Sequence, residues 1–433
     1  MNAEERARLL REVELSGNCS HPIRLRGEMV NLDTGEVGMS SLRVACKDRR
    51  QVVCPACSYA YRADAWILVA SGLNGGKGTP EAVGSHPRLF VTLTAPSFGA
   101  VHTIRTRGGC VALRATDHDP SPMCPHGRPR VCPDHHHASD SRLGRPLCDE
   151  CFDVEGAVLW NAHASRLWSR TVIHARRSLA EVGGVTQSRL GSVAQLHYLK
   201  VAEIQRRGLI HLHCVLRADG PEETGADPPS WLTSDALARV VHATAHHVST
   251  TGLDGRALRW GQVLDVQDLG SSLDNVTKVA SYVAKYATKS AEASGVLDRP
   301  IQSAEDLDSR PLTPHLRRMV ETAWELGDDP EFGHLRLQRY AHALGYGGQF
   351  LTKSQRYSST FANLRAERAQ WREARRLRGV APPEQAPSPD ASTSEWDVVG
   401  IGWASRGEAR FAEDRWQQSL EEIHLANEDR YSS

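Results

Sequence analysis

Two Cys-x-x-Cys pairs constrain this chain more than any other feature of its sequence. The spacing of Cys54 with Cys57, and of Cys148 with Cys151, lets two thiolates face one metal ion. A tetrahedral zinc ion then needs two more ligands, and four other cysteines can supply them. The first expected site consists of Cys19, Cys46, Cys54 and Cys57. The second consists of Cys124, Cys132, Cys148 and Cys151. Four protein ligands leave no open position, so the sequence predicts two structural zinc ions.

Histidines compete for the second of these sites. His126 and three histidines at 135–137 lie between Cys124 and Cys148. A redox role is the alternative for a Cys-x-x-Cys pair, and it requires a thioredoxin-like strand followed by a helix. Cys148 and Cys151 instead occupy a polar stretch before a predicted helix, which favours zinc.

Hydropathy and charge exclude several classes of protein. No apolar run approaches the roughly 18 residues of a membrane helix, and the N-terminal residues Glu4 and Glu5 are unlike a signal peptide. We therefore expect a cytoplasmic protein without a membrane span, whose thiols bind metal rather than form disulfides. The 52 basic residues, only seven of them lysine, balance 52 acidic ones, so any nucleic-acid surface must be local.

No nucleotide cofactor is expected. The glycine-rich stretch at 71–80 fails the spacing Gly-x-x-x-x-Gly-Lys-Ser/Thr of a phosphate-binding loop. Ser71 stands where the first glycine belongs, and Gly78 follows Lys77.

Periodicity predicts an α+β fold. The expected strands are 89–94, 196–205, 209–216 and 262–268. The expected helices are 154–179, 233–250, 276–290 and a basic helix at 353–378. Residues 291–330 are expected to be loop-rich, and the Pro- and Ser-rich stretch at 380–395 to be a disordered linker.

These features suggest four consecutive regions. The expected regions are an N-terminal zinc module (1–66), a catalytic domain (67–290) with a zinc-binding insertion (110–152), a helical, basic region (291–379), and a disordered linker with an acidic tail (380–433).

His211-Leu212-His213 lies on the second strand of a predicted hairpin. Histidines two residues apart on a strand point to the same face, and the flanking residues are apolar. Buried imidazoles are costly unless they are hydrogen-bonded or bind a metal. Across the hairpin, Glu203 or Gln205 can complete a three-ligand site with open positions. A pair of hydrogen-bonded core histidines is the alternative.

Two tyrosines recur one turn apart on the helix predicted at 276–290. Tyr282 and Tyr286 share a face, and Lys285 and Lys289 each follow a tyrosine by three residues. A deprotonated tyrosine can attack a phosphodiester, and a neighbouring ammonium would lower the tyrosine pKa and hold the phosphate. The alternative is an amphipathic helix that buries two tyrosines and solvates two lysines.

Together these segments resemble the HUH endonucleases that initiate rolling-circle replication. The resemblance rests on three motifs in the family's order: Phe90-Val91-Thr92-Leu93-Thr94, His211-Leu212-His213 and Tyr282-x-x-Lys285-Tyr286-x-x-Lys289. More closely, the chain is similar to initiators of actinobacterial plasmids and integrative conjugative elements. Those further similarities lie at 19–25, 53–58, 146–151, 203–208 and 352–354, and the resemblance covers about residues 19–378.

The resemblance implies a central antiparallel sheet flanked by helices, with the histidines on an inner strand and the tyrosine helix beside it. It implies Mg²⁺ or Mn²⁺ at His211 and His213. Glu203 is preferred as the third ligand because a carboxylate is a hard ligand, and Gln205 is the alternative. Tyr282 and Tyr286 would be the nucleophiles.

The implied activity is site-specific nicking and rejoining of single-stranded or supercoiled origin DNA through a 5′-phosphotyrosine. A host polymerase would extend the freed 3′-OH. With no nucleotide motif in the chain, unwinding would fall to a host helicase.

DNA contacts are expected from the zinc modules and the basic helix. The candidate phosphate-binding residues are Arg356, Arg365, Arg368, Arg372, Arg375 and Arg376. A solvated surface helix is the plainer alternative for such a charge run.

Three alternative functions differ from the initiator. An HUH two-tyrosine transposase would keep the chemistry and be flanked by its own element ends. A conjugative relaxase usually carries its tyrosines ahead of the histidines, which is the reverse of the order here. A non-catalytic zinc-containing DNA-binding regulator would form no covalent adduct.

Overall fold

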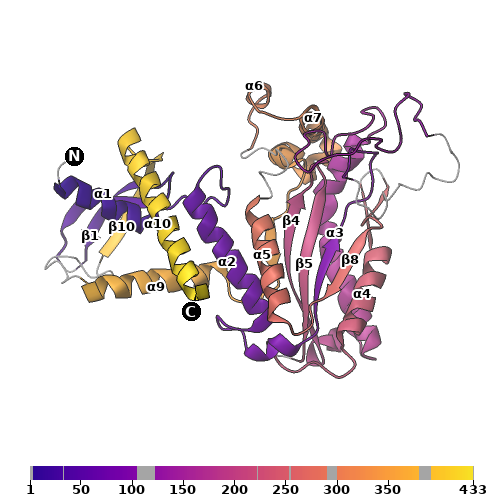
Figure 1. Cartoon of the computed structure of the whole chain (residues 1–433), viewed down its shortest axis with the longest axis horizontal. Coiled ribbons are helices and arrows are strands. Elements are labelled where there is room, and N and C mark those ends of the chain that lie inside the picture. The colour runs from indigo at the N-terminus through magenta and orange to yellow at the C-terminus, as the bar shows by residue number, and fades with distance from the viewer. Residues whose placement is uncertain are drawn as a thin grey trace. The chain divides into compact units, whose positions relative to one another are not determined.

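The computed structural model describes residues 3–32, 34–104, 122–221, 223–252, 255–289, 300–379 and 392–432. Contacts divide the chain into two compact units, one of Met1–Ala65 with Thr360–Ser433 and one of Trp66–Ser359. We call them the terminal unit and the central unit. The terminal unit combines the two ends of the sequence (Figure 1), so the units cut across the four consecutive regions expected from the sequence.

A three-stranded antiparallel sheet of order β10-β1-β2 lies in the terminal unit. The elements of this unit are α1 (Ala3–Leu15), β1 (Ile23–Asn31), β2 (Val37–Val44), the first part of α2 (Pro55–Asn74), α9 (Phe361–Gly379), β10 (Ser392–Ile401) and α10 (Arg406–Ser432). A side chain at Gly27 would collide with the backbone of Glu395, so glycine permits the close pairing of β1 with β10.

The end of the disordered linker expected at 380–395 is instead part of a strand, and the acidic tail that follows is folded. Residues 392–401 form β10 and 406–432 form α10, whereas 380–391 lie outside the described residues. Trp403 packs with Leu9 and Val13 of α1, and its Nε1 donates to the carbonyl of Cys19 at 3.0 Å. Burial of large aromatic side chains provides the stabilisation that the acidic composition did not reveal.

A five-stranded antiparallel sheet organises the central unit, in the order β8-β3-β5-β4-β9. Its strands are β3 (Arg88–Leu93), β4 (Gln195–Ile204), β5 (Ile210–Asp219), β8 (Leu264–Asp268) and β9 (Leu351–Lys353). A separate pair consists of β6 (Ser249–Thr251) and β7 (Ala257–Arg259). The strands predicted at 89–94, 196–205, 209–216 and 262–268 are confirmed. Gly208 in the β4–β5 turn has a φ of 81°, a conformation that favours glycine.

Helices cover both faces of this sheet (Figure 1). These are α3 (Val154–Val182), α4 (Ser234–His247) and α5 (Leu273–Lys289). The central unit also contains α6 (Ala304–Asp308), α7 (Pro314–Asp328) and α8 (Leu337–Tyr340). Side chains alternate along β5, so Leu212 and Cys214 join the apolar core with α3 and α4. His211 and His213 point to the opposite face, where the tyrosines of α5 contact His213. The helices predicted at 154–179, 233–250 and 276–290 are confirmed.

Residues 291–330 are less loop-rich than expected. Residues 290–299 lie outside the described residues, but α6 and the 15-residue α7 occupy much of the remainder. Thr313 caps α7 by accepting a hydrogen bond from the backbone N–H of Leu316, and Pro314 follows at the first helical position. This Thr-Pro start is the local signal that the sequence analysis missed.

No helix in the described part of the chain is both long enough and apolar enough to cross a membrane.

A buried ion-pair cluster supports the central sheet and gives a testable prediction. Asp219 and Arg217 are fully buried, joined at 2.7 and 2.8 Å, and His86 Nδ1 lies 2.9 Å from Asp219. Burial alone would raise the pKa of Asp219, but hydrogen bonds from His86 and Arg217 hold that pKa below its ordinary value. The Asp219 carboxylate therefore contributes stability that is fully present above about pH 4 and is lost as the pH falls further.

We expect Asp219→Asn to destabilise the central unit by about 3 kcal/mol, because it leaves the buried guanidinium of Arg217 without its charge partner. Urea unfolding at neutral pH measures the change. Asp227→Asn is the matched control, since Asp227 is 95% exposed and only 3.8 Å from the same His86. Equal stability of Asp219→Asn and the control would contradict the prediction.

Candidate active site and metal centres

The β4–β5 hairpin brings the predicted catalytic-metal ligands onto one face of the sheet. Glu203 lies opposite His211 in the strand register. Glu203 Oε2 is 3.1 Å from His213 Nε2, and the rings of the two histidines are 4.6 Å apart. Gln205, the alternative ligand, has its Nε2 3.2 Å from His211 Nδ1. The structure thus brings these four polar side chains together at one end of the hairpin.

Neighbouring groups orient the two imidazole rings. Thr92 Oγ1 on β3 is 3.3 Å from His213 Nδ1, which leaves His213 Nε2 directed at Glu203. Burial, together with the charges of His213 and Arg207, lowers the pKa of His211 to about 3. His211 is therefore neutral at physiological pH, which is the form that binds a metal ion. Thr92 belongs to the first of the three motifs, and only its contact with His213 reveals a role for it.

Among the described residues, Glu203, His211 and His213 do not form one of the compact groups that could hold a metal ion, but the pair of Glu203 and His213 has a suitable spacing. Two ligands at about 2.1 Å from an octahedral ion, at right angles, lie about 3.0 Å apart. The observed distance between Glu203 Oε2 and His213 Nε2 is 3.1 Å. One carboxylate and two imidazoles also leave coordination positions open.

Helix α5 places both predicted tyrosines over His213. The ring centroids of Tyr282 and Tyr286 are 5.0 and 5.1 Å from that of His213, and 4.6 Å from each other. Phe90 on β3 completes the aromatic wall, at 5.7 Å from Tyr282 and 5.9 Å from His213. Buried residues on the other side of α5, such as Val283 and Ala287, hold the helix in this orientation.

The lysines of α5 do not produce the lowered tyrosine pKa that was expected. Lys285 Nζ lies 5.7 Å from the ring centroid of Tyr286, whereas the side chain of Lys289 lies outside the described residues. A lowered tyrosine pKa was expected, but burial and a hydrogen bond with Tyr286 raise the pKa of Tyr282. Glu203 and Asp265 add negative charge near Tyr282, so this phenol stays protonated in the free protein.

The four cysteines of the first expected site converge in the terminal unit. The sulfur atoms of Cys19, Cys46, Cys54 and Cys57 all lie within 4.8 Å of one another. Cys19 and Cys54 are 3.7 Å apart, as are Cys46 and Cys57, and sulfurs at 2.3 Å from a tetrahedral zinc ion are about 3.8 Å apart. Hydrogen bonds among the four thiols lower the pKa of Cys54 and Cys46 and raise the pKa of Cys19 and Cys57, as expected when neighbouring thiols share protons in the absence of a metal ion. We call these residues the four-cysteine group.

The second expected site has one different ligand. His126 joins Cys124, Cys148 and Cys151, with its Nδ1 3.3 Å from the sulfur of Cys151 and 3.6 Å from that of Cys148. Cys132, assigned to this site from the sequence, lies in another group. The reason is a tight turn in which Cys124 N donates to the carbonyl of Arg128, since this turn carries His126 back towards the Cys-x-x-Cys pair. Both groups could hold zinc.

The six candidate DNA-binding arginines do not share one surface helix. Arg356 precedes α9 and belongs to the central unit, whereas Arg365 is exposed on α9 in the terminal unit. Arg368 forms a two-pronged ion pair with the buried Asp64 of α2, so its charge is already engaged. The helix continues through Arg372, Arg375 and Arg376, whose side chains lie outside the described residues.

Comparisons with known proteins agree on one family. A family model described as "Replication initiator protein, pSAM2" matches residues 5–417. A protein of Streptomyces ambofaciens, named replication initiator protein, is 36% identical over 425 residues, which cover 93% of this chain and 88% of that protein. No solved structure matches the chain significantly.

Proposed function

This chain belongs to the replication initiator family of actinobacterial plasmids, and from that premise we propose that it starts rolling-circle replication by nicking one DNA strand at an origin. It would then remain attached to the cut strand through a 5′-phosphotyrosine and later rejoin it. One observation carries this proposal: the tyrosine pair of α5 lies over His213, which in turn contacts Glu203.

The nicking reaction follows from the order of these groups. A scissile phosphodiester placed between the histidine hairpin and α5 would face a phenol oxygen of Tyr282 or Tyr286. That oxygen attacks phosphorus, the bond to the 3′ oxygen breaks, and the 5′ phosphate stays on the tyrosine. The phenol loses one proton and the departing 3′ oxygen gains one, so the reaction consumes no oxidant or nucleotide.

A Mg²⁺ or Mn²⁺ ion held by His211, His213 and Glu203 would supply positive charge beside the scissile phosphate. Thr92 keeps His213 in the required orientation. Lys285, whose Nζ lies near the Tyr286 ring, would pair with a phosphate oxygen.

The second tyrosine allows a second transfer at the same site. After a host polymerase has extended the 3′-OH, the regenerated origin can be cut by the tyrosine that is still free. The 3′-OH released by this cut attacks the first phosphotyrosine and closes a circle. Strand separation would come from a host helicase or from supercoiling, and Arg365 with the rest of α9 would contribute phosphate contacts.

A covalent-adduct assay tests this function. Purified full-length protein is mixed with labelled single-stranded oligonucleotides that tile the DNA around its gene, with Mn²⁺ or with EDTA. We expect a Mn²⁺-dependent labelled protein band on a denaturing gel for a tile that contains the origin. Folded, zinc-loaded protein that labels with no tile would favour a non-catalytic DNA-binding regulator instead.

His213→Ala is expected to slow adduct formation by at least about 100-fold, because it removes a ligand and leaves Glu203 without its contact. The Mn²⁺ concentration for half-maximal rate should also rise. His242→Ala, on the exposed side of α4, is the matched control and should behave as wild type. An unchanged rate and an unchanged Mn²⁺ requirement in His213→Ala would refute the catalytic-metal assignment.

A further inference from the structure

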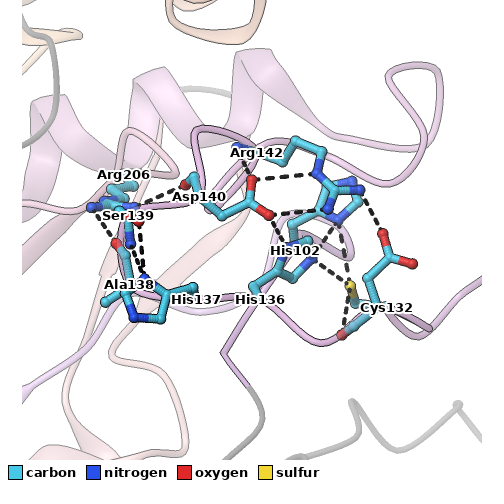
Figure 2. Close-up of polar contacts among 10 residues, drawn as sticks. His102, Cys132, His136, His137, Ala138, Ser139, Asp140, Arg142 and Arg206 are labelled. Carbon is cyan, nitrogen blue, oxygen red and sulfur yellow. Dashed lines mark hydrogen bonds and ion pairs between the residues drawn. The ribbon is translucent and has the colours of Figure 1, made fainter.

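A third group of side chains that could hold a metal ion takes Cys132 away from the second expected zinc site. The segment of the chain that connects β3 to α3 contributes all three residues, His102, Cys132 and His136. Figure 2 shows their nitrogen and sulfur atoms facing one another. His136 Nε2 is 3.0 Å from His102 Nδ1 and 3.1 Å from Cys132 Sγ. Cys132 Sγ is 3.4 Å from His102 Nδ1, so the three atoms form a compact triangle.

The triangle has nearly the size that one zinc ion requires. Bonds of about 2.0–2.1 Å to nitrogen and 2.3 Å to sulfur, at tetrahedral angles, place neighbouring ligand atoms about 3.3–3.6 Å apart. The observed sides of 3.0–3.4 Å differ from this by a few tenths of an ångström. Small shifts of the three side chains would admit the ion.

The partner of His136 prepares it as a ligand. Its side chain is fully buried, and its Nδ1 lies 2.7 Å from Asp140 Oδ2. Nδ1 therefore donates its proton to the carboxylate, and the lone pair of Nε2 faces Cys132 and His102. Metal-binding histidines almost always have such a second partner. Arg142 holds Asp140 in place through contacts of 3.0 and 3.3 Å (Figure 2).

We propose that His102, Cys132 and His136 bind a third zinc ion; among the described residues no fourth histidine, cysteine or carboxylate joins the group. Two imidazoles and a thiolate select zinc over the harder Mg²⁺ and Mn²⁺. Cys132 also lines a cavity of about 1080 Å³, together with Thr103 and Arg130.

The third zinc ion would brace the turn of the histidine hairpin. Arg206 in that turn donates to the carbonyls of Ala138 at 2.9 Å and Asp140 at 3.2 Å, within the loop that begins at His136 (Figure 2). The adjacent Arg207 donates to Gln205 Oε1 at 2.8 Å, and Gln205 contacts His211. An effect of this zinc ion on nicking rests on the proposed function, whereas the binding site itself does not.

Metal content tests the site without any activity measurement. Full-length protein purified with excess zinc and then desalted is analysed by atomic emission. We expect three zinc ions per chain in wild type, one for each group, and two in Cys132→Ser and His136→Ala. His137→Ala is the matched control, because it removes the neighbouring exposed histidine, and it should retain three. Two ions in wild type, or three in Cys132→Ser, would overturn the proposal.

A second measurement covers the case in which a variant misfolds. Cys132→His keeps a ligand at the same position, so it should retain three zinc ions while Cys132→Ser loses one.

Discussion

Replacing both Tyr282 and Tyr286 by phenylalanine is expected to abolish the covalent protein–DNA adduct. Phenylalanine keeps each ring, and therefore the packing against His213 and Phe90, but removes the only atom that can bond to phosphorus. The ring centroids of Tyr282 and Tyr286 lie 5.0 and 5.1 Å from that of His213, so we expect either tyrosine to replace the other for a single cut, and only the double variant to lose all labelling. The measurement is the denaturing-gel assay with the origin oligonucleotide and Mn²⁺.

The single variants separate the two transfers. Each of Tyr282→Phe and Tyr286→Phe is expected to lose the coupled cut-and-rejoin reaction on a substrate with two origin copies, since one phenol must hold the first strand while the other attacks. Tyr340→Phe, on the short helix α8, is the matched control. If one single variant performs every step of rejoining, the protein uses a single tyrosine. If the double variant still forms the adduct, the nucleophile lies elsewhere.

Replacing Cys54 and Cys57 by serine is expected to unfold the terminal unit. The four-cysteine group lies at the centre of a small cluster that includes Ala56 and Trp416, and few other apolar residues are available to stabilise it. Zinc bound by four thiolates contributes about 10 kcal/mol or more to the folding of a small domain. That exceeds the usual stability of a small domain, so loss of the ion should be decisive.

Limited proteolysis and tryptophan fluorescence measure this unfolding. Rapid cleavage within 3–65 and 392–432, and a shift of the fluorescence of Trp403 and Trp416 towards that of exposed tryptophan, are expected. Cys214→Ala is the matched control, because Cys214 is a buried thiol of β5 outside the three metal-binding groups. Protease resistance equal to wild type in the double serine variant would show that zinc is dispensable for this unit.

Local patterns in the sequence were sufficient for most of the central unit. Alternation along β5 predicted that His211 and His213 share a face, and helical spacing predicted the same for Tyr282 and Tyr286. Such periodicities depend only on backbone geometry, so they hold wherever the element packs. The Cys-x-x-Cys pairs are equally local, and both lie within groups that could hold zinc.

Only the tertiary structure shows which residues, distant in the sequence, contact the residues in these local patterns. Spacing alone allows either Cys132 or His126 to complete the second site, and Cys132 was the prediction. The tight turn after Cys124 brings His126 to this site instead. The sequence predicted Arg368 as part of a basic DNA-binding face. In the structure Arg368 pairs with Asp64, which is about three hundred residues away in the chain. The acidic C-terminal segment likewise gained its strand by pairing with β1.

The sequence by itself determined which side of a strand or helix the candidate residues occupy, because this depends on neighbours within a few residues. The tertiary structure decided which faces meet. It placed α5 over His213, raised rather than lowered the pKa of Tyr282, and gathered His102 with Cys132 and His136. These outcomes depend on burial and on contacts between residues distant in the chain, and neither spacing nor composition encodes them locally.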